Sequence, residues 1–269
     1  MLIKQVSIIG CGWLGFPLGI ALTQNGIMVN GSTTSKEKFN QLKSYKINPF
    51  LIRLTEDGIK GNIDGFLEKS DVVIINIPPG LRKNPDKNHV TEIAHLAESI
   101  NQNQNKTVIY ISSTFVFKNE INIPVITSET QPNNFDTGKQ LIEIEKILTE
   151  NYAFKTTIIR FGGLIDEQRH PGNYLSGRTA IKNPDAPINL IHKADCIGII
   201  TQIIKKELFD ITLNAVYPSH PTRKNYYTNY CKNKVLPIPI FETTGLNKGK
   251  IIDSAKLILL LNYKFKHAL

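Results

Sequence analysis

A glycine-rich hexapeptide near the amino terminus has the spacing of a phosphate-binding turn. Gly10-Cys11-Gly12-Trp13-Leu14-Gly15 follows an apolar run at residues 5–9 and precedes a stretch of helical periodicity at residues 14–24. In a strand–turn–helix of this kind, the first glycine permits the tight turn, the second lets the backbone approach a pyrophosphate, and the third lets the helix pack on the strand. The free N–H groups at the start of the helix then face the phosphates. The hexapeptide predicts a dinucleotide site with contacts from Gly10, Gly12, Trp13, Leu14 and Gly15.

The end of the second predicted strand indicates which dinucleotide is bound. Sites for NAD usually place an acidic residue there, where its carboxylate binds the ribose 2′-hydroxyl. Here the strand at residues 28–31 runs into Ser32-Thr33-Thr34-Ser35-Lys36, which contains no acid. Hydroxyls and a lysine suit a 2′-phosphate better, so we predict NADP, with NAD as the alternative. The competing interpretation is that these residues only cap the helix that begins at Lys36. The predicted contacts are Ser32, Thr33, Thr34 and Lys36.

The elements that must position this turn alternate along the first half of the chain. Short β-branched runs predict strands at residues 5–9, 28–31, 50–54, 72–77 and 107–112. Longer stretches between them predict helices at residues 14–24, 36–45, 59–67 and 91–101. The run at 72–77 is apolar at nearly every residue, which is typical of a strand covered on both faces. The alternation predicts an α/β fold, a Rossmann-type doubly wound parallel sheet.

The second half of the chain is less regular. It predicts a helix at residues 137–151, a strand at 156–161, an extended loop rich in Gly, Pro and Asn at 162–190, a helix at 194–208 and a strand at 212–216. We predict a dinucleotide-binding domain at residues 1–162, to which the helix and strand at about 191–217 return. In this prediction residues 163–269 form a small C-terminal substrate-binding cap, with a further helix opened by His220-Pro221-Thr222-Arg223.

Composition and charge restrict the class of protein. Of the 269 residues, 41% are hydrophobic and 20% charged, which is ordinary for a globular protein. Three separated cysteines form no metal-binding pattern, and no run approaches the roughly 20 apolar residues that cross a bilayer, so we predict a cytoplasmic protein with neither a metal nor a membrane partner. The net charge of +9 comes from dispersed lysines rather than a basic stripe, which argues against nucleic acid. The expected partner is a small molecule, and the oligomeric state is left open.

A series of landmarks in a fixed order carries a resemblance to a known family. After the glycine turn come Ile77-Pro78-Pro79-Gly80, Tyr110-Ile111-Ser112-Ser113-Thr114-Phe115-Val116-Phe117, Glu129-Thr130-Gln131-Pro132, Arg160-Phe161-Gly162-Gly163 and Ile188-Asn189-Leu190-Ile191-His192-Lys193-Ala194-Asp195. With these landmarks, which span about residues 3–217, the chain resembles the extended and atypical short-chain dehydrogenase/reductases. That group includes the nucleotide-sugar epimerases and dehydratases.

The resemblance implies roles for residues outside the glycine turn. It places Ile77, Pro78 and Pro79 beside the cofactor. It places Ser113 and Thr114 where the family's serine binds the substrate carbonyl. The loop that extended members use for the anionic portion of the substrate corresponds to the segment with Tyr174 and Arg178. A substrate that is anionic or nucleotide-linked is therefore expected.

The chain departs from the family at the catalytic pair. The family uses Y-x-x-x-K, in which the tyrosine exchanges a proton with the carbinol oxygen, while the lysine lowers the pKa of the tyrosine and binds the nicotinamide ribose. One register puts Thr137 and Leu141 at these positions, and another puts Phe135 and Lys139 there. Neither register supplies a tyrosine. The candidate catalytic residues are Ser113, Thr114, Thr137 and Lys139, with His192 or Tyr174 as alternatives from the loops.

Three functional hypotheses follow from this departure. The protein is an NAD(P)-dependent oxidoreductase or epimerase-like enzyme with another proton donor, a non-catalytic NADP-binding sensor, or a structural protein that the cofactor stabilises.

Two further expectations concern single residues. We expect Asp195 to cap the helix that follows it and to hold His192. We expect Arg160 either to pair with a buried carboxylate or to approach a substrate phosphate.

Overall fold

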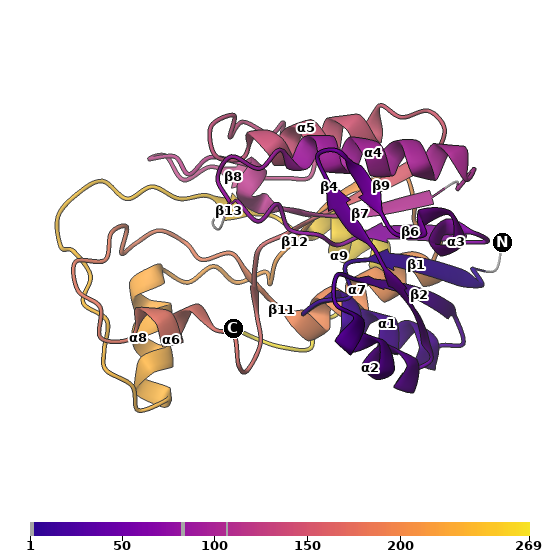
Figure 1. The fold of residues 1–269 in the computed structure, drawn as a ribbon. Helices are drawn as coiled ribbons and strands as arrows, with labels where there is room; N and C mark the ends of the chain where they lie inside the picture. Colours follow the sequence, from indigo (N-terminus) through magenta and orange to yellow (C-terminus); the bar gives the residue numbers. More distant parts are fainter. Residues whose placement is uncertain (1–2, 82–83, 106) are drawn as a thin grey trace. The chain divides into compact units, whose positions relative to one another are not determined.

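A seven-stranded parallel sheet is the largest sheet of the protein, in a computed structural model that describes residues 3–81, 84–105 and 107–269 (Figure 1). The strand order is β12-β9-β7-β6-β1-β2-β3. The bounds are Gln5–Ile9 for β1, Met28–Thr33 for β2, Ile47–Leu51 for β3, Val72–Ile75 for β6, Thr107–Ser113 for β7, Lys155–Phe161 for β9 and Thr212–Ala215 for β12. The predicted Rossmann-type doubly wound sheet is confirmed. Its strand order reverses between β1 and β6, which is where such sheets bind ligands.

Helices cover both faces of this sheet. On one face lie α1 (Gly15–Gln24) and α2 (Phe39–Ser44), and on the other lie α4 (His89–Gln102) and α5 (Lys139–Thr149), side by side (Figure 1). The short helix α3 (Ile63–Leu67) packs next to α4. Because both faces are covered, every residue of β6 is buried, as the continuous apolar run at residues 72–77 predicts.

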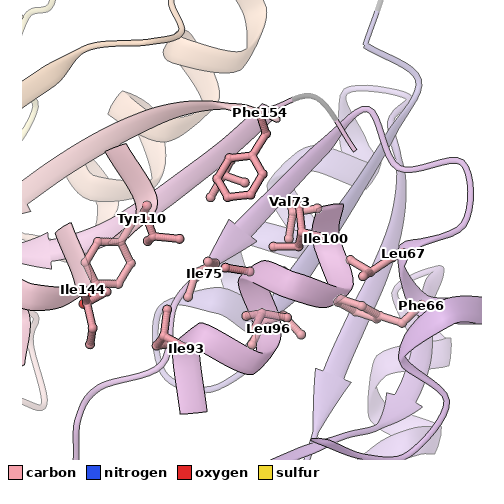
Figure 2. Packing of buried hydrophobic residues seen from close by; sticks show 14 of the residues in the cluster. Phe66, Leu67, Val73, Ile75, Ile93, Leu96, Ile100, Tyr110, Ile144 and Phe154 are labelled. Carbon is pink, nitrogen blue, oxygen red and sulfur yellow. The ribbon is translucent and has the colours of Figure 1, made fainter. Parts of the chain in front are cut away.

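The main apolar core lies between the sheet and the α4–α5 face. Alternate residues of each strand point to the same side, so Val73 and Ile75 of β6 face this layer together with Tyr110 of β7. From the helices, α4 contributes Leu96 and α5 contributes Ile144, both fully buried (Figure 2). This packing fixes the strands whose carboxyl ends carry the site described below.

The chain divides into two compact units, each assembled from three separate segments. Unit 1 comprises residues 1–113, 135–159 and 197–212, and unit 2 comprises 114–134, 160–196 and 213–269. The strands and α-helices that lie wholly in unit 2 are β8 (Val125–Ile126), β10 (Gly163–Ile165), α6 (Pro171–Leu175), β11 (Leu190–His192), α8 (Arg223–Asn233), β13 (Ile251–Ile252) and α9 (Ala255–Leu261). Helix α7 (Lys193–Lys205) begins in unit 2 and continues in unit 1. Unit 2 has an apolar cluster of its own, which includes Ile165, Ile188 and Tyr227.

The predicted helix at residues 59–67 is wrong in its first half. Residues Arg53–Thr55 (β4) and Gly58–Lys60 (β5) form an antiparallel hairpin, and α3 begins only at Ile63. Gly58 and Gly61 have φ angles of 130° and 116°, which a helix does not accept. The side chain of Asn62 accepts a hydrogen bond from Gly65 N and starts the helix there. The hairpin also divides the strand predicted at residues 50–54. In the structure β3 ends at Leu51, and β4, the first strand of the hairpin, begins at Arg53.

Three other predicted segments differ in detail from the structure. The stretch at residues 36–45 is a short 3-10 helix, Lys36–Lys38, followed by α2. The predicted loop at 162–190 contains β10 and α6. Helix α5 begins at Lys139, so Thr137 lies in the turn before it and not on the helix. In the described ranges, no helix is both long enough and apolar enough to span a bilayer.

Candidate functional site

The glycine turn after β1 has the shape that its sequence predicts. Gly10 has a φ angle of 99°, and a Cβ atom there would lie 2.4 Å from the carbonyl oxygen of Asn76. A Cβ on Gly15 would lie 2.2 Å from the carbonyl oxygen of Gly10. Both positions therefore require glycine, because a side chain there would collide with the protein's own backbone. At Gly12, by contrast, a Cβ would meet nothing within 4 Å. The space over Gly12 is open, which is where a phosphate group approaches such a turn.

Asn76 holds this turn from the neighbouring strand. Its backbone N–H donates to Ile9 O at 2.9 Å, and its side-chain Nδ2 donates to Gly10 O at 3.0 Å. Asn76 was not among the site residues predicted from the sequence. The signal was present, because Asn76 is the first polar residue after the buried run Val72–Ile75. An amide at the end of a strand next to β1 is well placed to fix a tight turn.

Ser32 supports the turn from the other neighbouring strand. Its Oγ accepts a hydrogen bond from Gly10 N at 2.8 Å, and its carbonyl oxygen accepts one from Cys11 N at 2.9 Å. The residue is 3% exposed. The Ser32 hydroxyl is therefore directed at the glycine turn, so its contribution to a dinucleotide site is to hold the turn in shape.

The segment after β2 presents cations beside this turn. Thr33 is buried and bonds to Ser35, whereas Thr34 and Lys36 are exposed. Lys38 is a further cation, which was not among the site residues predicted from the sequence. Burial raises the pKa of the Cys11 thiol to about 12, and the opposing influence on that pKa is the positive charge of Lys38. The positive charge of Lys38 thus acts on the second residue of the glycine turn.

The start of α1 is suited to an anion. The first turn of α1 contains no acidic residue, and the N-cap position, Leu14, makes no side-chain capping bond. Backbone N–H groups in the first turn of a helix lack carbonyl partners within it and carry the positive end of the helix dipole. A phosphate over Gly12 would face this end of α1.

The segment after β6 leads from Asn76 to α4. Ile77 packs against the main core, Pro79 is half-buried and Pro78 is exposed. At the start of α4, Glu92 is buried and accepts from Lys87 and from His89 Nδ1, each at 2.7 Å. Burial lowers the pKa of His89, while the hydrogen bond to Glu92 acts in the opposite direction. This polar cluster anchors the first turn of α4 and therefore the end of the segment that follows Ile77.

The candidate catalytic residues of unit 1 differ in their exposure to solvent. Ser113 is half-buried at the end of β7, whereas Thr137 is exposed. Lys139 is exposed, with its Nζ 3.7 Å from Glu143 Oε1. Phe135, which takes the tyrosine position in one register, is also exposed at 61%. The preceding residue of β7, Ser112, donates its hydroxyl to Glu145 Oε1 at 2.6 Å in the interior.

Tyr110 on β7 does not replace the absent tyrosine. It is fully buried in the main core, and burial together with the charge of Glu145 raises its pKa. A proton donor must reach its substrate within hydrogen-bond distance. Apolar side chains enclose Tyr110, so its hydroxyl does not reach a substrate.

Two of the candidate residues of unit 2, Tyr174 and Arg178, contact one another. Thr114 is buried in the short 3-10 helix Thr114–Val116. The guanidinium of Arg178 lies over the ring of Tyr174, with Cζ 3.6 Å from the ring centroid, and both side chains are exposed. Arg160 is buried over the ring of Phe117, with Cζ 5.1 Å from its centroid.

The two roles expected of Asp195, as the cap of α7 and as the partner of His192, are wrong. Asp195 lies within the first turn of α7, and its carboxylate accepts from Tyr263 Oη at 3.0 Å, from Lys266 N at 2.9 Å and from His267 N at 3.2 Å. It therefore holds the segment after α9 rather than capping α7. His192 has Nε2 3.3 Å from Glu167 Oε1 and stacks on the ring of His267. The carboxylate of Asp195 thus binds residues 263–267, and the acid next to His192 is Glu167.

Comparison with known proteins finds a relative that matches nearly the whole chain. No protein-family model matches. The chain is 28% identical over 271 residues to Protein YeeZ of Escherichia coli (strain K12), covering 98% of this chain and 96% of that protein. The name of YeeZ states no activity.

Solved structures resemble the chain in fold. MoeE5 in complex with UDP-glucose and NAD has a TM-score of 0.77 at 14% identity, covering 99% of this chain and 94% of that chain. A UDP-N-acetylglucosamine 4-epimerase from Bacillus cereus has a TM-score of 0.73 at 14% identity, covering 98% of this chain and 94% of that chain. The chain has the fold of these proteins. It is thus similar in architecture to nucleotide-sugar epimerases, as the order of the landmarks along the sequence predicts.

A cavity of about 1020 Å³ lies at the opposite edge of the sheet from the glycine turn. Its lining includes Asp71, Thr107 and Lys155, which stand at the amino ends of β6, β7 and β9. Ligands of open α/β sheets bind beyond the carboxyl ends of the strands. This cavity is therefore separate from the predicted dinucleotide site.

Proposed function

We propose that this protein binds a nicotinamide dinucleotide at the turn Gly10–Gly15 and acts as an atypical short-chain dehydrogenase/reductase on a nucleotide-linked small molecule in the cytoplasm. The observation that carries the proposal is the open space over Gly12, in a turn that Asn76 and Ser32 hold in shape. Glycine at positions 10 and 15 is explained by the protein's own backbone. At position 12 no protein atom lies close enough to require glycine, which supports the approach of a group from outside.

The fold supports the class of ligand. MoeE5 is described in complex with UDP-glucose and NAD, and with UDP-glucuronic acid and NAD. These structures have the same architecture, so a dinucleotide and a nucleotide-linked substrate are the ligands that we propose for this chain. When bound, the dinucleotide supplies a hydride acceptor or donor. The chain's own contribution would be the phosphate-binding turn and α1, with substrate contacts from Ser113, Thr114, Tyr174 and Arg178.

We propose NADP as the preferred form, with NAD as the alternative. Lys36 is exposed, and the charge of Lys38 acts on Cys11 within the turn. Two cations at the end of β2 favour a ribose that carries a 2′-phosphate. Glu37 lies between them in sequence, and its carboxylate bonds to the Ser35 hydroxyl. An acid at this end of β2 is the feature that favours the alternative.

Fluorescence of Trp13 provides the test of binding. Trp13 is the single tryptophan of the chain, and it lies half-buried inside the glycine turn. Titration with NADPH and NADH should change its emission with saturation, and NADPH should saturate at the lower concentration. Absence of a saturable change with both, together with no binding by calorimetry, would overturn the proposal.

A non-catalytic sensor is the second candidate function. The observation that favours it is the exposed turn before α5, where Phe135 and Thr137 stand in place of the family's tyrosine. The two functions differ in turnover. With UDP-glucose or UDP-glucuronic acid and either oxidised dinucleotide, the enzyme would produce reduced dinucleotide or an epimerised sugar. The sensor would bind the dinucleotide with neither product.

A further inference from the structure

The cavity at the amino ends of the strands lies within unit 1. Its volume is about 1020 Å³, and every residue that lines it belongs to that unit. The lining follows four neighbouring strands of the sheet, in the order β6, β7, β9 and β12. Asp71, Thr107, Lys155 and Asp210 lie at or just before the first residues of these strands. The cavity is therefore an elongated space across one edge of the sheet, and it shares no residue with the glycine turn.

Three long helices end at this cavity. In a doubly wound sheet the helices run antiparallel to the strands, so they end at the edge where the strands begin. Residues 103–105 follow α4, residues 151–155 follow α5 and residues 207–210 follow α7, and each of these segments contributes to the lining. The last turn of a helix presents carbonyl groups without N–H partners and the negative end of the helix dipole. A positively charged group is therefore favoured beside these helix ends.

Asn105 contributes an unused hydrogen-bond acceptor to the lining. The residue is 5% exposed, and its Nδ2 donates to Leu67 O at 3.1 Å and to Ser70 O at 2.9 Å. These two bonds fix the orientation of the carboxamide. Its Oδ1 accepts from none of the residues that the structure describes. A buried acceptor without a donor costs free energy, which a bound N–H group would recover.

Two carboxylates stand at the two ends of the cavity. Asp71, before β6, accepts from the backbone N–H groups of Lys4 and Gln5 through Oδ2, at 2.7 and 3.0 Å, and neither bond uses Oδ1. Asp210, before β12, is exposed. Three spacings between neighbouring strands separate β6 from β12, which corresponds to about 14 Å across the sheet. Asn105 precedes β7 and so lies between the two acids.

The remainder of the lining is partly apolar. Phe154 is buried at the start of β9, and Phe209 is half-buried before β12. Two lysines also line the cavity, and both are exposed. The Nζ of Lys69 lies 3.4 Å from Glu68 Oε1, and Lys155 is the first residue of β9. The acceptors are thus spaced along the cavity with apolar surface beside them, which suits a chain of methylene groups with positive charges at intervals.

We propose that this cavity binds an aliphatic polyamine that has an ammonium group at each end and a third between them. The terminal ammonium groups pair with Asp71 and Asp210, and the middle one donates to Asn105 Oδ1. The methylene groups lie against Phe154 and Phe209. Because the protein carries a net charge of +9, it repels such a ligand at long range, so binding requires a local arrangement of acceptors. The proposal is independent of the dinucleotide site.

The first test is calorimetric titration of the full chain with spermidine at low salt. We expect saturable binding at one site per chain. Putrescine has two ammonium groups on a shorter chain and cannot reach both acids, so it should bind at least tenfold more weakly. Sodium phosphate is the opposing probe, because it would bind through Lys69 and Lys155. Absence of saturable spermidine binding, or binding of phosphate in its place, would overturn the proposal.

The second test removes the charges and keeps the shape. In the double variant Asp71→Asn with Asp210→Asn, an amide oxygen still accepts from the backbone of Lys4 and Gln5. Asparagine also tolerates the positive φ of 63° at position 210. Spermidine affinity should fall tenfold or more, since the two ammonium groups lose their ion pairs.

The matched control is the double variant Asp57→Asn with Glu98→Gln. It changes the net charge by the same amount, and both of these acids are exposed and lie outside the cavity. Its affinity for spermidine should stay within twofold of that of the parent protein. Equal losses in the two double variants would assign the binding to overall charge and refute the site.

NMR locates the ligand without any substitution. The side-chain amide signals of Asn105 and Asn76 report on the two opposite edges of the sheet. Spermidine should shift the signal of Asn105 with the same saturation as the calorimetric titration, and it should leave that of Asn76 unchanged. A shift of Asn76 in place of Asn105 would put the polyamine at the glycine turn and overturn the proposal. Failure of the protein to bind NADPH or NADH would refute the proposed function and leave this result as it stands.

Discussion

The side-chain amide of Asn76 donates to the carbonyl oxygen of Gly10 across 3.0 Å and so joins the ends of β6 and β1. These are the two strands between which the order of the sheet reverses. Ser32 bonds to the N–H of the same glycine from β2, on the other side. Three adjacent strands therefore define the conformation of one residue, and the shape of the turn is set before any ligand is present.

Replacing Asn76 should weaken both the fold and the site. Asn76→Ala leaves the carbonyl of Gly10 without its side-chain donor, which we expect to cost about 1–2 kcal/mol in the free energy of unfolding. Dinucleotide affinity should fall several-fold because the turn is less well fixed. Urea unfolding and Trp13 fluorescence measure the two effects. Asn103→Ala is the control, since its amide bonds to Asp64 and Ser99 away from the turn; equal affinity losses in both variants would contradict the assigned role.

The glycines of the turn should separate binding from stability. Gly12→Val adds atoms where nothing lies within 4 Å, so it should leave thermal unfolding nearly unchanged while abolishing dinucleotide binding. Gly15→Ala places a Cβ 2.2 Å from Gly10 O, so it should lower the free energy of unfolding by about 3 kcal/mol. Calorimetric melting and fluorescence titration distinguish the two. Retained affinity in Gly12→Val would refute the dinucleotide site.

The cations after β2 should determine the preference between the two dinucleotides. In the double variant Lys36→Ala with Lys38→Ala, NADPH affinity should fall by about tenfold, or about 1.4 kcal/mol, while NADH affinity changes little. The reason is that the 2′-phosphate of NADPH loses its positive partners. Competition titrations at two salt concentrations measure the difference, which should shrink at high salt. Equal losses for both dinucleotides would place these lysines near the shared pyrophosphate.

Protonation of His170 should destabilise unit 2 in mild acid. Its ring stacks on Tyr230 with centroids 3.7 Å apart, and Nδ1 accepts from Gly172 N while Nε2 lies 2.9 Å from Tyr226 Oη. Burial, aided by the charge of Lys234, lowers the pKa of His170 from 6.5 to about 4. Between these values the unfolded chain takes up a proton that the folded chain resists. Stability should therefore fall as the pH drops from 6.5 towards 4, by about 1–2 kcal/mol.

Circular dichroism melts across this range test the dependence on His170. His170→Phe keeps an aromatic ring against Tyr230 but does not ionise, so its stability should vary less between pH 6.5 and pH 4 than that of the parent protein. An unchanged pH dependence in this variant would assign the acid sensitivity to other groups.

Periodicity was sufficient to predict the sheet because burial on both faces leaves a strong signal. The run Val72–Ile75 is apolar throughout, and β1 was placed at residues 5–9 as observed. The hairpin of β4 and β5 escaped prediction because its three-residue strands are shorter than any periodicity window. Its turn depends on the positive φ of Gly58, which is a property of conformation rather than of hydrophobic pattern.

Residues of the candidate site were predictable where the backbone conformation requires one residue type. Residues whose role depends on a contact with a distant part of the chain were not predictable. Gly10, Gly12 and Gly15 follow from the spacing alone. Asn76 and Lys38 act through neighbours from other strands or turns, and no local pattern shows such contacts. The role of Asp195 was predicted wrongly for the same reason, since its partners lie some 70 residues further along the chain.

The path of the chain through the two units has a consequence for synthesis and dissection. Each unit is assembled from three stretches, and the chain passes from one unit to the other five times between residues 113 and 213. Any continuous fragment that contains the whole of one unit also contains part of the other, so neither unit can be expressed alone by cutting the gene once. A nascent chain that has reached residue 196 still lacks part of both units. Completion of unit 1 therefore waits for residues 197–212, and a premature stop codon before them would leave neither unit intact.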